Sequence, residues 1–258
     1  MRRLIDAHAH LSDLEDVEGV IQSAKQSGVD AIVAVSANTR TCKATLSWAE
    51  AFPGYVFPSL GIHPSEITRA RVFKDEHHPS IRFIEEQIGV CVAVGEIGLD
   101  YWSREAKKNE TVREGQHNIY VQQLQIAAKQ EKPASVHSRG SWRDALDLAR
   151  LHGPDRIVFH WYSGPIDILT EILDSGYQIS ATPATEYSLH HRAALLEAPL
   201  ERILIETDSP VYLRNRSRRS EPSDLRITVK ALAELKEISE EEVAKVTSRN
   251  AEKFFRLP

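Results

Sequence analysis

Histidines and carboxylates occur at short, regular spacings in several parts of this 258-residue chain. The first group is Asp6-Ala7-His8-Ala9-His10. Side chains two residues apart in an extended chain point to the same face, so His8 and His10 can both reach one ion. Imidazole and carboxylate ligands together suit zinc, manganese, nickel or cobalt. The first chemistry that these residues suggest is therefore the binding of a divalent metal ion.

Further residues of the same kinds each follow a short apolar run of the sequence. They are His63, Glu96, His137, His160 and Asp208. Because Gly95 and Gly98 flank Glu96, we expect a tight turn that brings its carboxylate inward, where it could bridge two ions. A mixed imidazole and carboxylate set also leaves coordination positions open for water, as a catalytic metal requires.

The elements that must position these side chains alternate along the chain. Eight short apolar runs indicate strands, at Leu4–Ile5, Ala31–Val35, Val56–Leu60, Cys91–Val94, Ala134–Val136, Ile157–Phe159, Tyr177–Ser180 and Ile203–Ile205. Segments of helical periodicity fall between or after them, among them Val17–Ser27, Ile81–Ile88, Gln116–Gln130, Trp142–Leu151, Ile166–Asp174 and Leu225–Glu237. A last helix is expected to start at the capping-box-like Ser239-Glu240-Glu241-Glu242. This alternation predicts an α/β fold, a (β/α)₈ TIM barrel formed by residues 1–258 as a single domain.

In such a barrel the chemistry lies at the carboxyl ends of the strands, because the loops from strand to helix surround that rim. These metal-binding or acid/base groups, His63 included, follow six different strands of the prediction. We therefore expect them to converge on one site.

Composition limits the other classes of function. The net charge of −5 argues against a protein that coats nucleic acid with a broad basic surface, although a local site remains possible. No apolar stretch has the length of a signal peptide or a membrane span, so we expect a cytoplasmic protein. Cys42 and Cys91 are expected to be free, partly buried thiols.

The motifs, taken in order, resemble those of the TatD family of metal-dependent deoxyribonucleases, within the amidohydrolase superfamily. The resemblance extends from Asp6 to Phe255. The matching segments are Asp6–His10, Gly61–Pro64, Val94–Tyr101, His137–Arg139, His160–Gly164, Glu206–Pro210 and Thr247–Asn250 followed by Phe254.

The resemblance implies two divalent ions, of zinc, manganese, magnesium, nickel or cobalt. One would be held by His8, His10, Glu96 and Asp208, and the other by Glu96, His137 and His160, with Glu96 bridging. Two such ions activate a shared water and neutralise charge on a scissile phosphate. The catalytic residues would be Asp208, Glu96 and His63, of which Asp208 orients or deprotonates the water and His63 donates a hydrogen bond to a phosphate oxygen.

The implied substrate is DNA, most simply a single strand. The segment 214–219 holds four arginines, and we expect Arg214 and Arg216 to contact phosphates, although a solvated loop is the alternative. Trp161 is the preferred aromatic residue for stacking a base; Tyr101, Trp102 and Tyr162 could also stack, or could wedge the loops. Arg139 is a further candidate for substrate contact. Nothing in the sequence indicates a membrane or protein partner.

Two other functions stay open at this stage. The same metal chemistry could hydrolyse an ester or amide, such as an aminoacyl-tRNA. A non-catalytic nucleic-acid-binding module is a different class, but it would be expected to lack a ligand, and every expected ligand is present. The remaining histidines are expected mostly at the surface; they are His77, His78, His117, His152, His190 and His191.

Overall fold

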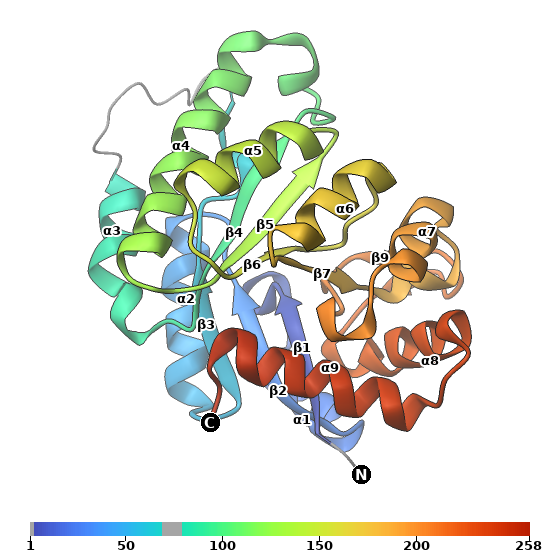
Figure 1. The fold of residues 1–258 in the computed structure, drawn as a ribbon. Coiled ribbons are helices and arrows are strands. Elements are labelled where there is room, and N and C mark those ends of the chain that lie inside the picture. The colour runs from blue at the N-terminus through green and yellow to red at the C-terminus, as the bar shows by residue number, and fades with distance from the viewer. Residues whose placement is uncertain (1–2, 69–78) are drawn as a thin grey trace.

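Eight parallel strands form one sheet in the computed structural model, which describes residues 3–68 and 79–258. Neighbours along the chain are neighbours in the sheet, in the order β1 to β8. The strands are β1 (Leu4–Ala9), β2 (Val29–Val35), β3 (Val56–Leu60), β4 (Ala93–Asp100), β5 (Ala134–Arg139), β6 (Ile157–Phe159), β7 (Gln178–Ala181) and β8 (Ile203–Ile205). The sheet curls into a nearly closed barrel, so the predicted (β/α)₈ fold is confirmed (Figure 1).

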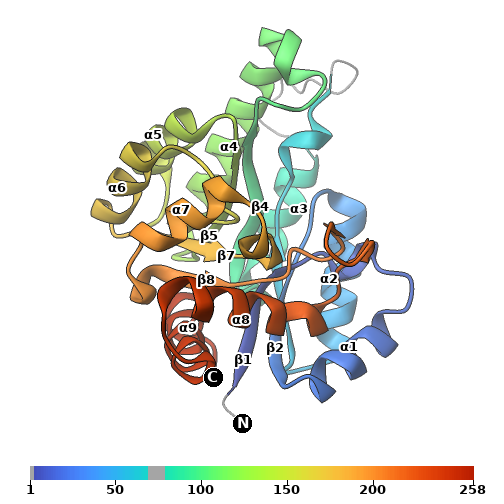
Figure 2. The ribbon, with the colours of Figure 1, turned by 90° about the vertical axis from the view of Figure 1, so that its right-hand side faces the viewer.

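Helices surround the barrel, as the two perpendicular views show (Figure 1 and Figure 2). They are α1 (Val17–Gln26), α2 (Thr39–Ala51), α3 (Pro79–Gln87), α4 (Glu110–Lys129), α5 (Trp142–His152), α6 (Ile166–Asp174), α7 (Leu189–Glu197), α8 (Leu225–Lys236) and α9 (Glu240–Phe255). Local signals set several of their starts. The Ser239 hydroxyl accepts the backbone N–H of Glu242 at 3.1 Å, which confirms the predicted start of α9. The short strands β9 (Tyr212–Leu213) and β10 (Arg218–Arg219) form a hairpin after β8.

Helix α9 closes one end of the barrel. Its residues Phe254 and Phe255 pack into the barrel interior against Ile5, Val33 and Leu204 from three strands. Burial of each phenylalanine contributes about 1.5–3 kcal/mol of hydrophobic stabilisation. This end, where β1 begins, is therefore packed for stability, and the opposite rim is left for chemistry.

The barrel closes between its first and last strands near that opposite rim. Ala9 and Ser209 form a parallel bridge, and the His10 N–H donates to the Ser209 carbonyl oxygen at 2.7 Å. The Asp208 N–H donates to the His8 carbonyl oxygen at 3.0 Å. The closure itself therefore places Asp208 beside the two histidines of β1.

Several strands run further than their apolar runs predicted. Because backbone pairing continues beneath polar side chains, β1, β4 and β5 include His8, Glu96 and His137, which had been expected in the following loops. The expected turn at Glu96 is also wrong, since Glu96 lies within β4 at an irregularity in its pairing with β5. Gly98 instead allows the strands to approach closely: a Cβ there would lie 2.0 Å from the His137 carbonyl oxygen.

Two simpler expectations can be compared with the structure. Cys42 and Cys91 are both free, and they are fully buried rather than partly so. In the described ranges, no helix combines the length and the apolar character that crossing a bilayer requires.

Candidate metal centre

The carboxylate of Glu96 lies at the centre of a cluster of five imidazoles. Its Oε2 is 3.4 Å from His8 Nε2 and 3.1 Å from His10 Nε2. Its Oε1 is 2.8 Å from His160 Nε2, 2.9 Å from His137 Nδ1 and 3.3 Å from His63 Nε2. Each oxygen of one carboxylate therefore faces a different group of histidines.

Asp208 completes the side of the cluster that β1 contributes. Its Oδ1 is 3.6 Å from His8 Nε2 and 3.5 Å from His10 Nε2. The potential ligand atoms form three overlapping groups, each within 4.8 Å: His8, His160 and Asp208; His8, His10 and Glu96; and His63, Glu96 and His137. All six ligands predicted from the sequence thus come together, and His63 joins them.

These side chains come from five strands or the residues that directly follow them. His8 lies in β1 and His10 directly follows it, Glu96 lies in β4 and His137 in β5, while His160 follows β6 and Asp208 follows β8. The carboxyl ends of parallel barrel strands meet at one rim, which explains why residues so distant in sequence converge. Glu96 is only 3% exposed, so its charge needs close partners.

The hydrogen-bond pattern around His160 fits a cation at this centre. Its Nδ1 lies 3.2 Å from Glu206 Oε1, and since a carboxylate only accepts, Nδ1 carries a hydrogen. The Nε2 of a neutral ring then has a lone pair, yet it lies 2.8 Å from the acceptor Oε1 of Glu96. A proton or a metal ion between them resolves this conflict, and imidazole nitrogens with carboxylate oxygens are a donor set that divalent ions accept.

The electrostatics favour the charged forms of these groups. Burial disfavours a carboxylate, but the imidazoles of His63 and His160 outweigh it and hold the pKa of Glu96 well below its usual range. Burial likewise disfavours an imidazolium, but the hydrogen bonds that His10 donates to Asp208 and Glu96 raise its pKa to about 10. The site is thus built to hold positive charge, which protons supply when no metal ion is bound.

A second layer of polar residues orients the candidate ligands. Ser135 Oγ lies 3.1 Å from His8 Nδ1, and Asp100 Oδ2 lies 3.5 Å from His137 Nε2. Sequence reasoning assigned no role to these residues or to Glu206, although Asp100 and Glu206 lie within the motifs. Such partners fix the ring orientation and tautomer of a metal-binding histidine.

Asp6 stabilises the same rim from below. It is fully buried and accepts hydrogen bonds from the Thr207 N–H at 3.0 Å and the Thr207 hydroxyl at 2.6 Å. Burial raises the pKa of Asp6 to about 8, against the lowering effect of these hydrogen bonds. Asp6 thereby ties β1 to the segment that carries Asp208.

His63 differs from His160 in its tautomer. Its Nδ1 accepts the backbone N–H of Ser65 at 3.1 Å. Burial lowers the pKa of His63 and so favours the neutral ring. A neutral ring that accepts at Nδ1 carries its hydrogen on Nε2, the nitrogen that faces Glu96. His63 is therefore arranged as a donor toward the centre.

The predicted substrate-binding residues are more dispersed. The guanidinium of Arg139 donates two hydrogen bonds to Asp100, from Nε to Oδ1 at 3.1 Å and from one terminal nitrogen to Oδ2 at 2.7 Å. Trp161 is partly buried, and its backbone N–H donates to the Ser180 hydroxyl and to the Glu206 carboxylate. Arg216 forms a two-pronged ion pair with Glu186 at 2.5 and 3.0 Å, whereas the Arg214 guanidinium lies over the Tyr187 ring.

Two other side chains are buried, which favours the loop-wedging alternative for Tyr162 and makes His191 an exception among the histidines expected mostly at the surface. Tyr162 cannot stack a base, because it is 1% exposed and its hydroxyl donates to the Pro165 carbonyl oxygen. His191 is buried rather than at the surface, and it joins the loops after β6 and β7 by accepting the Thr182 N–H and donating to the Tyr162 carbonyl oxygen. His190 is exposed as expected, His117 and His152 are half-buried, and His77 and His78 lie outside the described residues.

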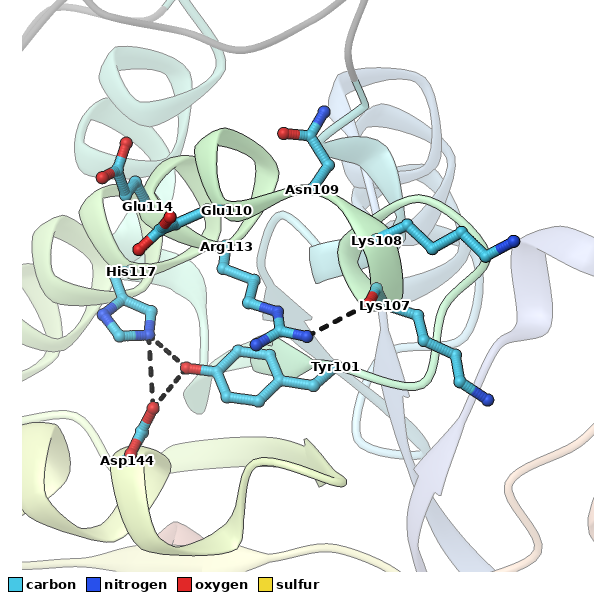
Figure 3. A pocket seen from close by; sticks show the side chains of 9 residues that line it. All are labelled: Tyr101, Lys107, Lys108, Asn109, Glu110, Arg113, Glu114, His117 and Asp144. Atoms are coloured by element: carbon cyan, nitrogen blue, oxygen red, sulfur yellow. Dashed lines mark hydrogen bonds and ion pairs between the residues drawn. The ribbon is translucent and has the colours of Figure 1, made fainter.

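A pocket of about 550 Å³ opens beside the loop that follows β4 (Figure 3). The Tyr101 hydroxyl donates to Asp144 and lies against His117, and the Arg113 guanidinium covers the Tyr101 ring at 4.9 Å. Lys107 and Lys108 lie at the other side of the pocket. The pocket contains none of the candidate ligands.

Comparison with known proteins agrees with this geometry. The family model described as TatD related DNase matches residues 5–256. The chain belongs to the TatD family. It is 33% identical to the human protein named deoxyribonuclease TATDN3 over 98% of the chain and 94% of that protein. It is 30% identical to an uncharacterized metal-dependent hydrolase of Methanocaldococcus jannaschii, over 98% of the chain and 97% of the relative.

Solved structures of TatD proteins share the fold. The TatD homologue YjjV of Escherichia coli superposes with a TM-score of 0.86 at 25% identity, over 99% of this chain and 98% of that one. As a TatD protein, the chain is a metal-dependent hydrolase that acts on ester bonds. The alternative of a non-catalytic binding module is thereby set aside.

Proposed function

We propose that this TatD protein hydrolyses phosphodiester bonds of DNA with the help of two divalent metal ions. The observation that carries the proposal is the placement of Glu96, whose Oε2 faces His8 and His10 while its Oε1 faces His137 and His160. A carboxylate with ligands on both sides suits a bridging role. The first ion would be held by His8, His10, Glu96 and Asp208, and the second by Glu96, His137 and His160.

When bound, two divalent ions lower the pKa of a water molecule and offset the negative charge that develops on the phosphate. The protein's own residues handle protons and orientation. Asp208 is the candidate general base: it would take a proton from water as the water oxygen bonds to phosphorus, and the bond to the leaving oxygen would break as that oxygen takes a proton from solvent. His63 directs its Nε2–H to the centre, where it would donate to a phosphate oxygen.

The relatives support DNA as the substrate class. The human relative is named a deoxyribonuclease, and a mouse relative, 32% identical over 98% of this chain, is named a putative one. Within that class, we propose a single strand as the substrate.

Substitution of Asp208 by asparagine tests the proposal. Asparagine keeps the shape and one acceptor oxygen but takes no proton. Asp208→Asn should fold, keep the second ion, bind single-stranded DNA and cleave it at least about 10²-fold more slowly. Single-turnover cleavage and DNA affinity are measured together, with zinc, manganese, magnesium, nickel and cobalt supplied in turn.

Two results would count against this scheme. Near-normal cleavage by Asp208→Asn would remove Asp208 from proton transfer. If wild-type protein hydrolyses an aminoacyl-tRNA ester with every metal but leaves single-stranded DNA intact, the ester replaces DNA as the substrate.

A further inference from the structure

An exposed indole lies on the catalytic rim, two residues after the end of the strand that carries Glu96. Trp102 is 58% exposed, although tryptophan is usually buried in soluble proteins. It directly follows Tyr101, which anchors the loop through Asp144 and His117 (Figure 3). The exposure is therefore not the result of a loose loop.

The Trp102 ring is held in one orientation. Its edge packs against Trp142, with ring centroids 5.5 Å apart and an interplanar angle of 87°. It also lies across Gly140, where a Cβ would be 2.4 Å from the indole Cδ1. Trp142 lies in the same way against Gly164. Glycine at 140 thus leaves room for the Trp102 ring, which packs against Trp142 and stays exposed to solvent.

The same carboxylate connects Trp102 to the metal centre. Asp100 Oδ1 accepts the N–H groups of Trp102 and Ser103, both at 3.0 Å. Its Oδ2 lies 3.5 Å from Nε2 of the candidate ligand His137. The carboxylate that holds the Trp102 backbone therefore also contacts a candidate metal ligand.

Cationic side chains share the Asp100 partner of Trp102 or follow it in the chain. The guanidinium of Arg139, whose side chain is 54% exposed, lies on Asp100, and Lys107 and Lys108 follow in the same loop. Neither lysine side chain has an ion-pair partner among the described residues. An exposed aromatic face beside positive charge is the usual arrangement for one base of a single strand with its flanking phosphates.

We infer that Trp102 is a stacking platform for one nucleobase of the strand whose phosphate is cleaved. This inference rests on the proposed function. It assigns base stacking to Trp102 in place of Trp161, whose ring is partly buried and whose backbone is tied to Glu206. Stacking tolerates any base, so the platform would place the strand without selecting a sequence.

The test couples the side chain to one position of the strand. The probe is a fluorescein-labelled thymidine oligonucleotide with phosphorothioate linkages, and a series of probes carries one abasic residue at successive positions. Affinity is measured by fluorescence anisotropy for wild type, Trp102→Leu, Trp102→Phe and, as a control, Leu151→Ser, which changes an exposed apolar residue of α5.

Wild type should lose roughly tenfold in affinity when one particular base is removed. Trp102→Leu should bind the intact probe about tenfold more weakly and lose nothing further at that position. Trp102→Phe should keep most of the affinity, and Leu151→Ser should bind like wild type.

Two outcomes would overturn the inference at different levels. If wild type binds the probes but the losses from Trp102→Leu and from each abasic residue simply multiply, the platform is wrong and the DNA substrate stands. If folded, metal-loaded wild-type protein binds no oligonucleotide at all, the proposed function fails and the platform fails with it.

Discussion

Hydrogen bonds on the far side of each imidazole decide what that ring offers to the metal centre. Glu206 holds the hydrogen of His160 on Nδ1 and leaves Nε2 free to bind a cation. Ser65 does the reverse for His63, since its N–H occupies Nδ1. Two histidines that look equivalent in the sequence are therefore prepared for different tasks.

Removal of the His63 side chain tests this distinction. His63→Ala should keep its full metal content and lose about 10²-fold in cleavage rate, because a hydrogen bond to the developing charge is lost. His137→Ala is the matched comparison and should lose metal. Metal content is measured by elemental analysis after dialysis. Loss of an ion from His63→Ala would make His63 a ligand and contradict the tautomer argument.

At the scale of elements, the close contact between β4 and β5 sets the distance from Glu96 to His137. Gly98 has a φ of +136°, and a Cβ there would meet the His137 carbonyl oxygen at 2.0 Å. Gly98→Ala should therefore lower the free energy of unfolding by at least about 2 kcal/mol and also weaken metal binding.

Gly54 provides the matched control for this prediction. Its φ is +74°, but a Cβ would meet no atom within 4 Å. Gly54→Ala should cost only about 1–2 kcal/mol from the backbone conformation, and metal binding should not change. Urea unfolding followed by circular dichroism measures both variants. Equal losses of stability and metal in the two would show that the strand contact has no special role.

Much of this scaffold could be predicted from sequence, for identifiable reasons. β3, β6 and β8 coincide with their predicted runs because they are short and mostly apolar. The convergence of the ligands also followed, since each lies at the end of a strand in a regular barrel. Strand ends that carry polar residues were predicted too short, because side-chain patterns do not report backbone pairing.

The pairings across the rim could not be predicted in the same way. The ion pair between Arg216 and Glu186 joins residues from different loops, and no local pattern signals it. The buried state of His191 depends on backbone groups of Thr182 and Tyr162. The placement of the Trp102 ring likewise depends on the room left by Gly140, which is distant in sequence. Each of these features arises only when the loops after several strands meet.

For the molecule as a whole, a net charge of −5 makes local cations important for attracting a polyanion. Glu186 neutralises Arg216, and Asp224 neutralises Arg218. Arg214 lies over Tyr187, and Arg219 donates to the Pro210 carbonyl oxygen, so these two arginines of the loop keep a net charge for DNA.

The salt dependence of DNA binding separates these arginines. Arg214→Gln should lower the slope of log affinity against log salt by about one, because one phosphate contact is lost. The double variant Arg216→Gln with Glu186→Gln removes a neutral pair and should leave the slope unchanged. Titrations at several salt concentrations measure both. An equal fall in slope for the two variants would show that Arg216 contacts phosphate despite its ion pair.

Metal binding should also stabilise the entire barrel, because the candidate ligands join β1, β4, β5, β6 and β8 into one cluster. A ligand at 100 times its Kd stabilises a fold by about 2.7 kcal/mol, and each kcal/mol shifts the Tm of a protein near this size by about 2–4 °C. Removal of metal by a chelator should therefore lower the Tm by roughly 5–10 °C, and metal addition should restore it.

The shift in Tm should shrink as the pH falls, since protons compete with metal for the ligands. The pKa of His10 is raised from 6.5 to about 10, so protonation of the metal-free fold stabilises it fully below about pH 6.5, and this effect disappears as the pH rises through about 10. Scanning calorimetry with and without chelator, from pH 6 to 9, measures the difference, and His8→Ala with His10→Ala is the control that should lose most of it. A Tm that the chelator leaves unchanged at every pH would mean that the cluster holds no stabilising ion.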